Sequence, residues 1–104
     1  MRQSGSWMTI WDDRILEYIE QEESGSPSEL EKSGYLKISK SQISRRLRKL
    51  AERGLLNHLG NGVYVITDEG KAYLRGEYNA ETEAYINESA GESPSASPEE
   101  VNGS

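Results

Sequence analysis

The sequence predicts a mainly α-helical domain that carries one β-hairpin, in the order helix, helix, helix, hairpin, helix. Three observations support this fold class. Apolar residues recur at helical spacing in the first half of the chain. Two capping boxes, in which a Ser or Thr is followed three residues later by an acid or Gln, each precede such a stretch. The dipeptide Asn61-Gly62 separates two short apolar runs, which is a strong hairpin signal.

The first two helices are delimited by capping and turn residues. A capping box in the sequence TIWD predicts a helix over residues 10–22. Ser26 is a favoured capping residue, and Pro27 is favoured in the first helical position. Gly34 is a natural helix stop. We therefore expect a short second helix over residues 27–33.

The third helix and the hairpin form the centre of the chain. The capping box SKSQ predicts a helix over residues 40–53, and Gly54 ends it. Apolar runs on both sides of the Gly-Asn-Gly sequence predict the hairpin, with its projecting part at residues 57–63. We expect a fourth helix that opens at the sequence TDEG, includes residues 72–74 and restarts through residues 78–86.

These elements form a single domain. We expect residues 1–8 to be a polar leader and residues 9–86 to be the domain with a C-terminal helical extension. Residues 87–104 are expected to be a disordered acidic tail, because Gly, Ser, Pro and Glu dominate them. This tail either keeps the protein soluble or screens a basic surface elsewhere on the chain. Three helices followed by a hairpin are the arrangement of a winged helix-turn-helix, with the hairpin as wing and the third helix as recognition helix.

The charge is segregated along the chain. The formal net charge is −6, yet residues 32–53 hold eight cations and one acid. A basic block inside an acidic chain predicts contact with nucleic acid. The sequence has no Cys, so disulfides and thiolate metal sites are excluded. No apolar run approaches the roughly 20 residues that a membrane-spanning helix needs. We expect a cytoplasmic protein without a membrane partner.

The third helix separates an apolar face from a polar and basic face. At about 100° per residue, the core side holds Ile43, Leu47, Leu50 and Ala51. On the outward side, Arg can bind guanine through two hydrogen bonds and Gln can do the same to adenine. Other cations suit phosphate contacts. A solvated helix face is the alternative, although such faces usually mix both signs. The residues of this helix that we expect to contact DNA are Lys40, Ser41, Gln42, Ser44, Arg45, Arg46, Arg48 and Lys49.

Two polar residues of the hairpin are further candidates for DNA contact. His58 and Asn61 could touch the DNA backbone or the minor groove. For Asn61 the alternative is that it serves only the turn, where Asn-Gly is favoured. For His58 both readings stay open. His58 is the one histidine of the chain and has no accompanying cluster of metal ligands, so we expect no metal site.

Aromatic residues gather near the two ends of the expected domain. They either fill the core or anchor an interface, where aromatic residues are enriched. Because helix-turn-helix proteins often bind two half-sites as symmetric dimers, we expect a homodimer. Its interface would use the N-terminal segment and the helix expected over residues 72–86. The expected interface residues are Trp7, Trp11, Tyr73, Tyr78 and Tyr85.

Two segments of the chain resemble a known family. These are ISKSQISRRLRKLAERGLL at residues 38–56 and LGNGVYVITDEGKAYL at residues 59–74. They resemble haloarchaeal winged-helix transcriptional regulators similar to the repressor of the halophilic phage phi-H. The likeness extends over residues 8–86. It implies a DNA-binding transcriptional regulator, and a repressor in particular, that acts on double-stranded DNA in a salt-loaded cytoplasm.

The sequence bears on three classes of function. The first is a sequence-specific regulator that reads the major groove with residues 40–53 and the backbone or minor groove with residues 57–63. The second is a winged-helix adaptor that binds an acidic protein partner and no DNA. The third is an enzyme, which we do not expect, because the sequence offers no nucleophile–base pair and no Gly-rich phosphate loop. Neither a cofactor nor a small-molecule effector is indicated.

Overall fold

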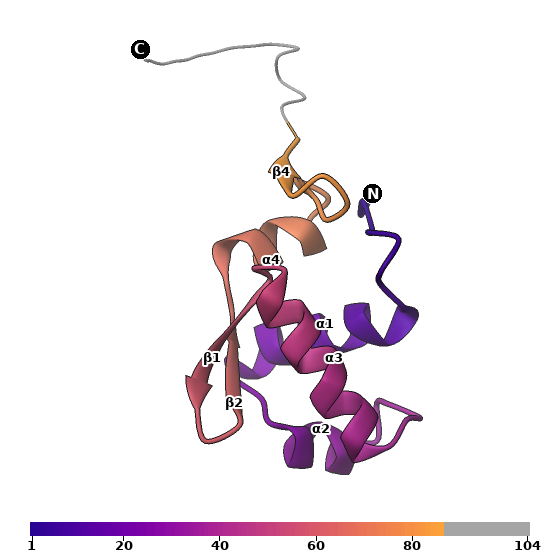
Figure 1. The fold of residues 1–104 in the computed structure, drawn as a ribbon, viewed down its shortest axis with the longest axis vertical. Helices are drawn as coiled ribbons and strands as arrows, with labels where there is room; N and C mark the ends of the chain where they lie inside the picture. Colours follow the sequence, from indigo (N-terminus) through magenta and orange to yellow (C-terminus); the bar gives the residue numbers. More distant parts are fainter. Residues whose placement is uncertain (87–104) are drawn as a thin grey trace.

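The computed structural model describes residues 1–86 and shows three helices with a hairpin at one side of them, followed by a short helix and a second, smaller hairpin (Figure 1). The acidic tail expected at residues 87–104 lies outside the described residues. The elements are α1 (Ile10–Glu22), α2 (Pro27–Ser33), α3 (Lys40–Glu52), β1 (Leu56–Gly60), β2 (Val63–Ile66), α4 (Asp68–Leu74), β3 (Tyr78–Asn79) and β4 (Ala84–Tyr85). The expected winged-helix fold class is confirmed.

The helices begin and end where their capping residues stand. The Oγ of Ser39 accepts a hydrogen bond from the backbone N–H of Gln42 at 3.2 Å, and the Gln42 Oε1 accepts one from the Ser39 N–H at 3.1 Å. The Ser26 Oγ likewise accepts a hydrogen bond from the third helical N–H of α2 at 3.3 Å. Gly34 ends α2 with φ of 80°, a conformation that glycine adopts without strain. The expected limits of α1 and α2 are confirmed, and α3 ends one residue early, with Arg53 as its cap.

The core lies between α1, α3, α4 and the inner side of the hairpin. The expected core face of α3 is confirmed, because Ile43, Leu47 and Leu50 are fully buried. Ala51, the fourth residue expected there, is partly buried against the same core. Further residues buried with these three are Ile15, Leu16, Ile19, Leu30, Leu55 and Tyr73. One charged residue, Asp12, is also fully buried among the described residues.

The main hairpin is fastened to the loop between α1 and α2. Gly25 and Tyr64 exchange two backbone hydrogen bonds, of 2.9 and 2.8 Å, so Gly25 acts as a minimal third strand. The pairing of β1 with β2 is antiparallel and shifts between His58 and Gly60, which leaves Leu59 as a bulged residue. At the turn, Asn61 has φ of 54°, in the left-handed region that Asn tolerates.

The prediction that the fourth helix restarts through residues 78–86 is wrong, because β3 and β4 pair there as a small antiparallel hairpin. The side chain of Asn79 explains the difference. Its Oδ1 accepts hydrogen bonds from the N–H groups of Glu81 and Thr82, at 2.8 and 3.1 Å. Such a side-chain turn competes with helix formation. The domain therefore has no C-terminal helical extension within the described residues.

The first residues of the chain pack on the domain. The Nε of Arg2 donates to the carbonyl of Leu74 at 3.0 Å, and its Nη1 donates to Glu17 Oε2 at 2.6 Å. The backbone of Gln3 accepts a hydrogen bond from the N–H of Ala80 at 2.9 Å. The polar leader expected at the N-terminus is therefore a strap that joins α1, α4 and the small hairpin.

Candidate nucleic-acid interface

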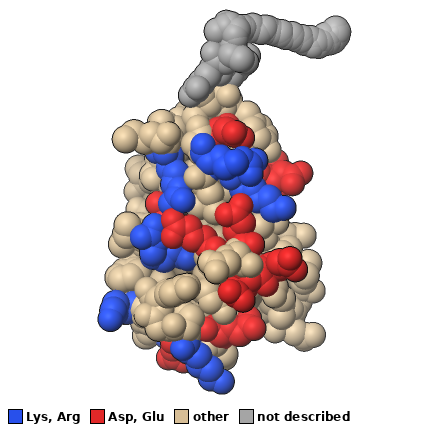
Figure 2. Space-filling model, turned by 180° about the vertical axis from the view of Figure 1, so that it is seen from behind, with Lys and Arg blue, Asp and Glu red and all other residues tan. Residues whose placement is uncertain are grey.

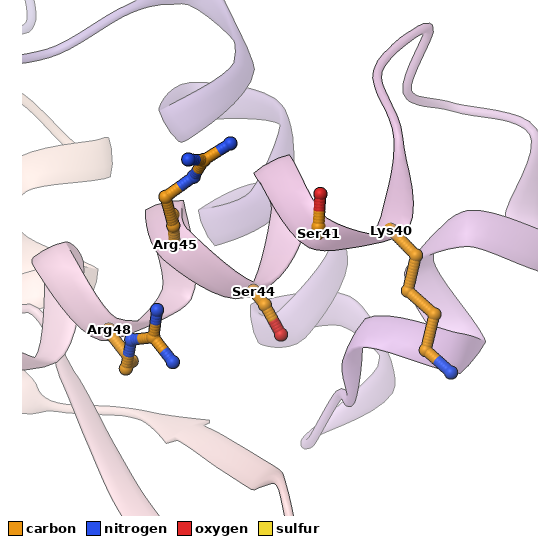
Figure 3. A pocket seen from close by; sticks show the side chains of 5 residues that line it. All are labelled: Lys40, Ser41, Ser44, Arg45 and Arg48. Atoms are coloured by element: carbon orange, nitrogen blue, oxygen red, sulfur yellow. The ribbon is translucent and has the colours of Figure 1, made fainter.

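The exposed face of α3 forms a shallow hollow with cations around it (Figure 3). Its lining residues are Lys40, Ser41, Ser44, Arg45 and Arg48. All five were expected to contact DNA. Their side chains come from successive turns of one helix, so a linear ligand could run along them. Serine leaves space beside the two arginines, which lets a ligand approach the helix closely.

Most of the basic block, residues 32–53, has no acidic partner among residues 1–86. Of its eight cations, Arg46 and Arg53 form ion pairs in the part of the chain that the structure describes. The other six, which have none within residues 1–86, are Lys32, Lys37, Lys40, Arg45, Arg48 and Lys49. By contrast, the face of the molecule opposite to the view of Figure 1 carries acidic groups down its middle, with Lys and Arg among them (Figure 2). The unpaired cations therefore gather in and near α3, as a phosphate-binding surface requires.

Arg46 was expected to contact DNA, but its partly buried guanidinium is bonded to groups of the protein itself. Its Nε donates to Asp12 Oδ1 at 2.9 Å, its Nη2 donates to Asp12 Oδ2 at 2.7 Å, and Nη2 also donates to the carbonyl of Trp7 at 3.0 Å. The hydrogen bonds to Asp12 raise the pKa of Arg46 above its ordinary value, although burial opposes them. Arg46 thus joins α3 to the start of α1, and its guanidinium does not project from the exposed face of α3.

A signal for this pairing exists in the sequence. Asp12 lies three and four residues before Ile15 and Leu16, on the stripe of α1 that faces the core. A buried carboxylate is costly unless a cation and hydrogen bonds satisfy it. An acid on an apolar stripe therefore predicts a paired cation from a neighbouring element, but it does not identify the residue that supplies this cation.

Gln42 has a structural role that restricts how it could read a base. Its Oε1 is occupied by the N–H of Ser39 in the capping box. The group that remains free for a ligand is the Nε2 donor. A two-point contact with adenine needs both Oε1 and Nε2, so it would have to share or break the cap.

The two hairpin candidates differ in their surroundings. The ring of His58 stacks on the ring of Tyr64, with centroids 4.5 Å apart and an interplanar angle of 15°. His58 therefore covers a buried tyrosine, while its outer face stays exposed. Asn61 is exposed and occupies a left-handed turn position, which supports the reading that it serves the turn.

Two of the residues expected at a dimer interface are part of the core. Tyr73 is fully buried, and Tyr78 is 6% exposed, so neither side chain is available to a second copy. The Tyr73 hydroxyl donates to Asp13 Oδ1 at 2.6 Å, and burial together with this bond raises its pKa to about 12. Tyr85 is 56% exposed and packs edge-on against Tyr78.

Trp7 and Trp11, the two other aromatic residues expected at the interface, are half-buried. The guanidinium of Arg53 lies 5.2 Å from the centroid of the Trp7 ring, and it also pairs with Glu83 at 3.1 Å. Together with the bond from Arg46, this contact joins Trp7 to α3 and to the residue that caps its end. Trp7 therefore has a role within one copy of the chain.

No helix among the described residues has the length and apolar character needed to cross a membrane. Within residues 1–86, no group of three or more His, Asp or Glu side chains is placed so that it could hold a metal ion.

Three helices, a hairpin after the third and a basic exposed face on that helix define a winged helix-turn-helix protein of the DNA-binding regulator class. Within this class, the chain belongs to the family of winged helix-turn-helix phage repressors, whose sequence profile matches residues 1–84. The resemblance to the phi-H repressor family is thereby confirmed.

Individual relatives agree with this assignment. The chain is 36% identical over 85 residues to the repressor protein of Halobacterium phage phiH, a match that covers 74% of this chain and 90% of that protein. The crystal structure of the PhiH1 repressor-like protein from Haloarcula marismortui matches with a TM-score of 0.82 and 67% identity, over 83% of this chain and 98% of that one. The reduced form of MarR from E. coli matches with a TM-score of 0.59 and 26% identity, over 67% of this chain and 51% of that one.

Proposed function

We propose that this protein is a sequence-specific transcriptional repressor that reads the DNA major groove with the exposed face of α3. The hairpin of β1 and β2 would contact the DNA backbone or the minor groove. The observation that carries this proposal is the set of unpaired cations on one face of the recognition helix. The family and the repressor from phage phiH support it.

The residues of α3 divide into roles by their position. Arg45 lies in the middle of the lining and can reach a base edge, where a two-point contact with guanine would give specificity. Lys40 and Arg48 lie toward the two ends of the same hollow and suit the phosphates on either side. Ser41 and Ser44 add short hydrogen-bonding groups between them. Arg46 is not part of this set, because Asp12 holds it.

A repressor of this size would act as a homodimer, because one recognition helix covers only one half-site. Two copies related by a twofold axis would read an inverted repeat. The partly exposed aromatic side chains of Trp7, Trp11 and Tyr85 remain candidates for the contact between copies. With DNA as its ligand, the protein would work in the cytoplasm.

The proposal is tested in two steps. Purified protein is first used to select genomic fragments, and sequencing should reveal an inverted repeat. Affinity for that operator is then measured against salt concentration. The logarithm of the binding constant falls with the logarithm of salt, by a slope of about −0.9 per phosphate contacted. Arg48→Gln should weaken binding and flatten the slope by about 0.9, whereas Glu20→Gln, on the exposed side of α1, should change neither.

The competing adaptor function has a distinct outcome. If the protein enriches no fragment and binds no random duplex at low salt, the unpaired cations of α3 have a different ligand. An acidic protein partner would then be sought. Weak binding to every duplex with a full salt slope, but no shared repeat, would support DNA contact and refute sequence specificity.

A further inference from the structure

The hairpin of β1 and β2 carries no formal charge, unlike the helix beside it. Residues 55–66 include no Asp, Glu, Lys or Arg. The one histidine in this stretch lies flat against Tyr64. A hairpin of this composition cannot bind DNA by pairing cations with phosphates, which is the contact that salt weakens.

The hairpin instead presents one large apolar side chain to solvent. Leu59 is 61% exposed, whereas Leu55 and Leu56, at the start of the same segment, are buried. The exposure follows from the bulge, because Leu59 lies between the pairs His58–Tyr64 and Gly60–Val63 and has no partner of its own. Bulges redirect a side chain away from the regular alternation of a strand. Leu59 therefore contributes little to the core and points outward near the end of the hairpin.

The position of Leu59 is fixed relative to α3. The backbone bonds between Gly25 and Tyr64 hold β2 from one side. At the base of the hairpin, the Thr67 hydroxyl donates to the carbonyl of Gly54 at 2.7 Å. The turn of the hairpin and the first turn of α3 lie toward the same end of the molecule (Figure 1). A duplex lying along the start of α3 would therefore reach the end of the hairpin as well.

We propose that Leu59 is the hairpin residue that contacts DNA, by packing against the deoxyribose walls of the minor groove. This inference rests on the proposed function and adds a second kind of contact to it. Proteins that enter the minor groove use apolar side chains such as Leu against sugars and base steps. An apolar contact is not weakened by salt as a phosphate contact is. α3 would thus supply the salt-sensitive part of the affinity and Leu59 a salt-insensitive part.

Three variants separate these two parts. Operator affinity is measured by fluorescence anisotropy from about 0.1 M to about 1 M salt. Leu59→Ala should weaken binding about five- to tenfold at every salt concentration, with the slope unchanged, because it removes apolar contact area only. Leu59→Lys should steepen the slope by about 0.9, because it adds one phosphate contact. Glu20→Gln, at an exposed position on α1 away from the hairpin, is the control and should behave like the unchanged protein.

The outcomes distinguish this inference from the function on which it rests. If Leu59→Ala binds like the unchanged protein while Arg48→Gln flattens the slope, the inference about the hairpin is overturned and the proposed function stands. If the unchanged protein binds no duplex, the proposed function itself fails. Sedimentation of each variant completes the test. A loss of affinity that coincides with dissociation into monomers would place Leu59 between two copies and overturn the DNA contact.

Discussion

Replacing Asp12 with alanine should be among the most destabilising single substitutions in this domain. Asp12 is fully buried and accepts hydrogen bonds from two guanidinium nitrogens of Arg46, at 2.9 and 2.7 Å. It also accepts one from the backbone N–H of Thr9 at 2.8 Å, which caps α1. Asp12→Ala removes all three interactions at once and leaves the cation of Arg46 without its partner.

The magnitude follows from the burial of the pair. Removing one member of a buried ion pair costs about 3–5 kcal/mol, because the other charge stays buried. The side chain of Arg46 is 25% exposed, so water can reach part of it and the cost should lie near the lower limit. Loss of the hydrogen bond from the Thr9 N–H adds about 1 kcal/mol. We expect a total of about 4 kcal/mol, which is a large share of the stability of an ordinary small domain.

The assay is urea unfolding followed by far-ultraviolet circular dichroism, with the free energy of unfolding obtained by linear extrapolation. Glu20→Ala, on the exposed side of the same helix, is the control. The double variant Asp12→Ala with Arg46→Met should recover part of the loss, because an apolar pair leaves no charge unpaired. A cost for Asp12→Ala within about 0.5 kcal/mol of the control would refute the reasoning, since surface substitutions usually stay within that range.

Three further predictions concern the strap, a buried hydroxyl and a close backbone contact. Deleting residues 1–7 should lower the melting temperature by about 5–10 °C, because the bonds that tie the strap to α1 and α4 are lost; an unchanged melting temperature would contradict this. Burial and the bond to Asp13 raise the pKa of Tyr73 to about 12 from 10.0, so its contribution to stability is complete below about pH 10 and is lost as the pH rises through 12. Tyr73→Phe should reduce that alkaline loss in urea titrations, and an equal loss in both proteins would disprove the assignment. Gly70→Ala should lower the free energy of unfolding by about 2 kcal/mol or more, because the added Cβ would lie 2.3 Å from the carbonyl oxygen of Leu55. A variant that calorimetry finds as stable as the unchanged protein would contradict this prediction.

The parts of the fold that the sequence predicts correctly depend on local interactions. The limits of α1 and α2 and the start of α3 follow from capping residues and from Gly34, whose effects act within one turn of chain. The hairpin follows from Asn61-Gly62, where the left-handed conformation is required locally. The core face of α3 follows from helical periodicity alone.

The predictions that the structure contradicts concern contacts between segments that are distant in the sequence. Residues 78–86 have apolar spacing compatible with a helix, but Ala80 pairs with Gln3 and the side chain of Asn79 closes a turn. The pattern of charges on α3 likewise does not reveal which cations are paired. Arg46 and Arg48 look alike in the sequence, yet only one of them meets the buried carboxylate of Asp12. The exposed lining of the candidate site was predictable, whereas the internal use of Arg46 was not.

The small hairpin and the strap bring the two ends of the described chain together. Met1 lies against Gly76, where an added Cβ would be 2.9 Å from the Met1 nitrogen, and the N-terminus and β4 lie at the end of the molecule away from the turn of the main hairpin (Figure 1). A fluorophore or second binding module joined at residue 1 or after residue 86 would therefore begin far from the first turn of α3 and from the turn of the main hairpin. Two such domains could be linked in tandem, and the linker would set their spacing along a duplex without crossing either recognition helix.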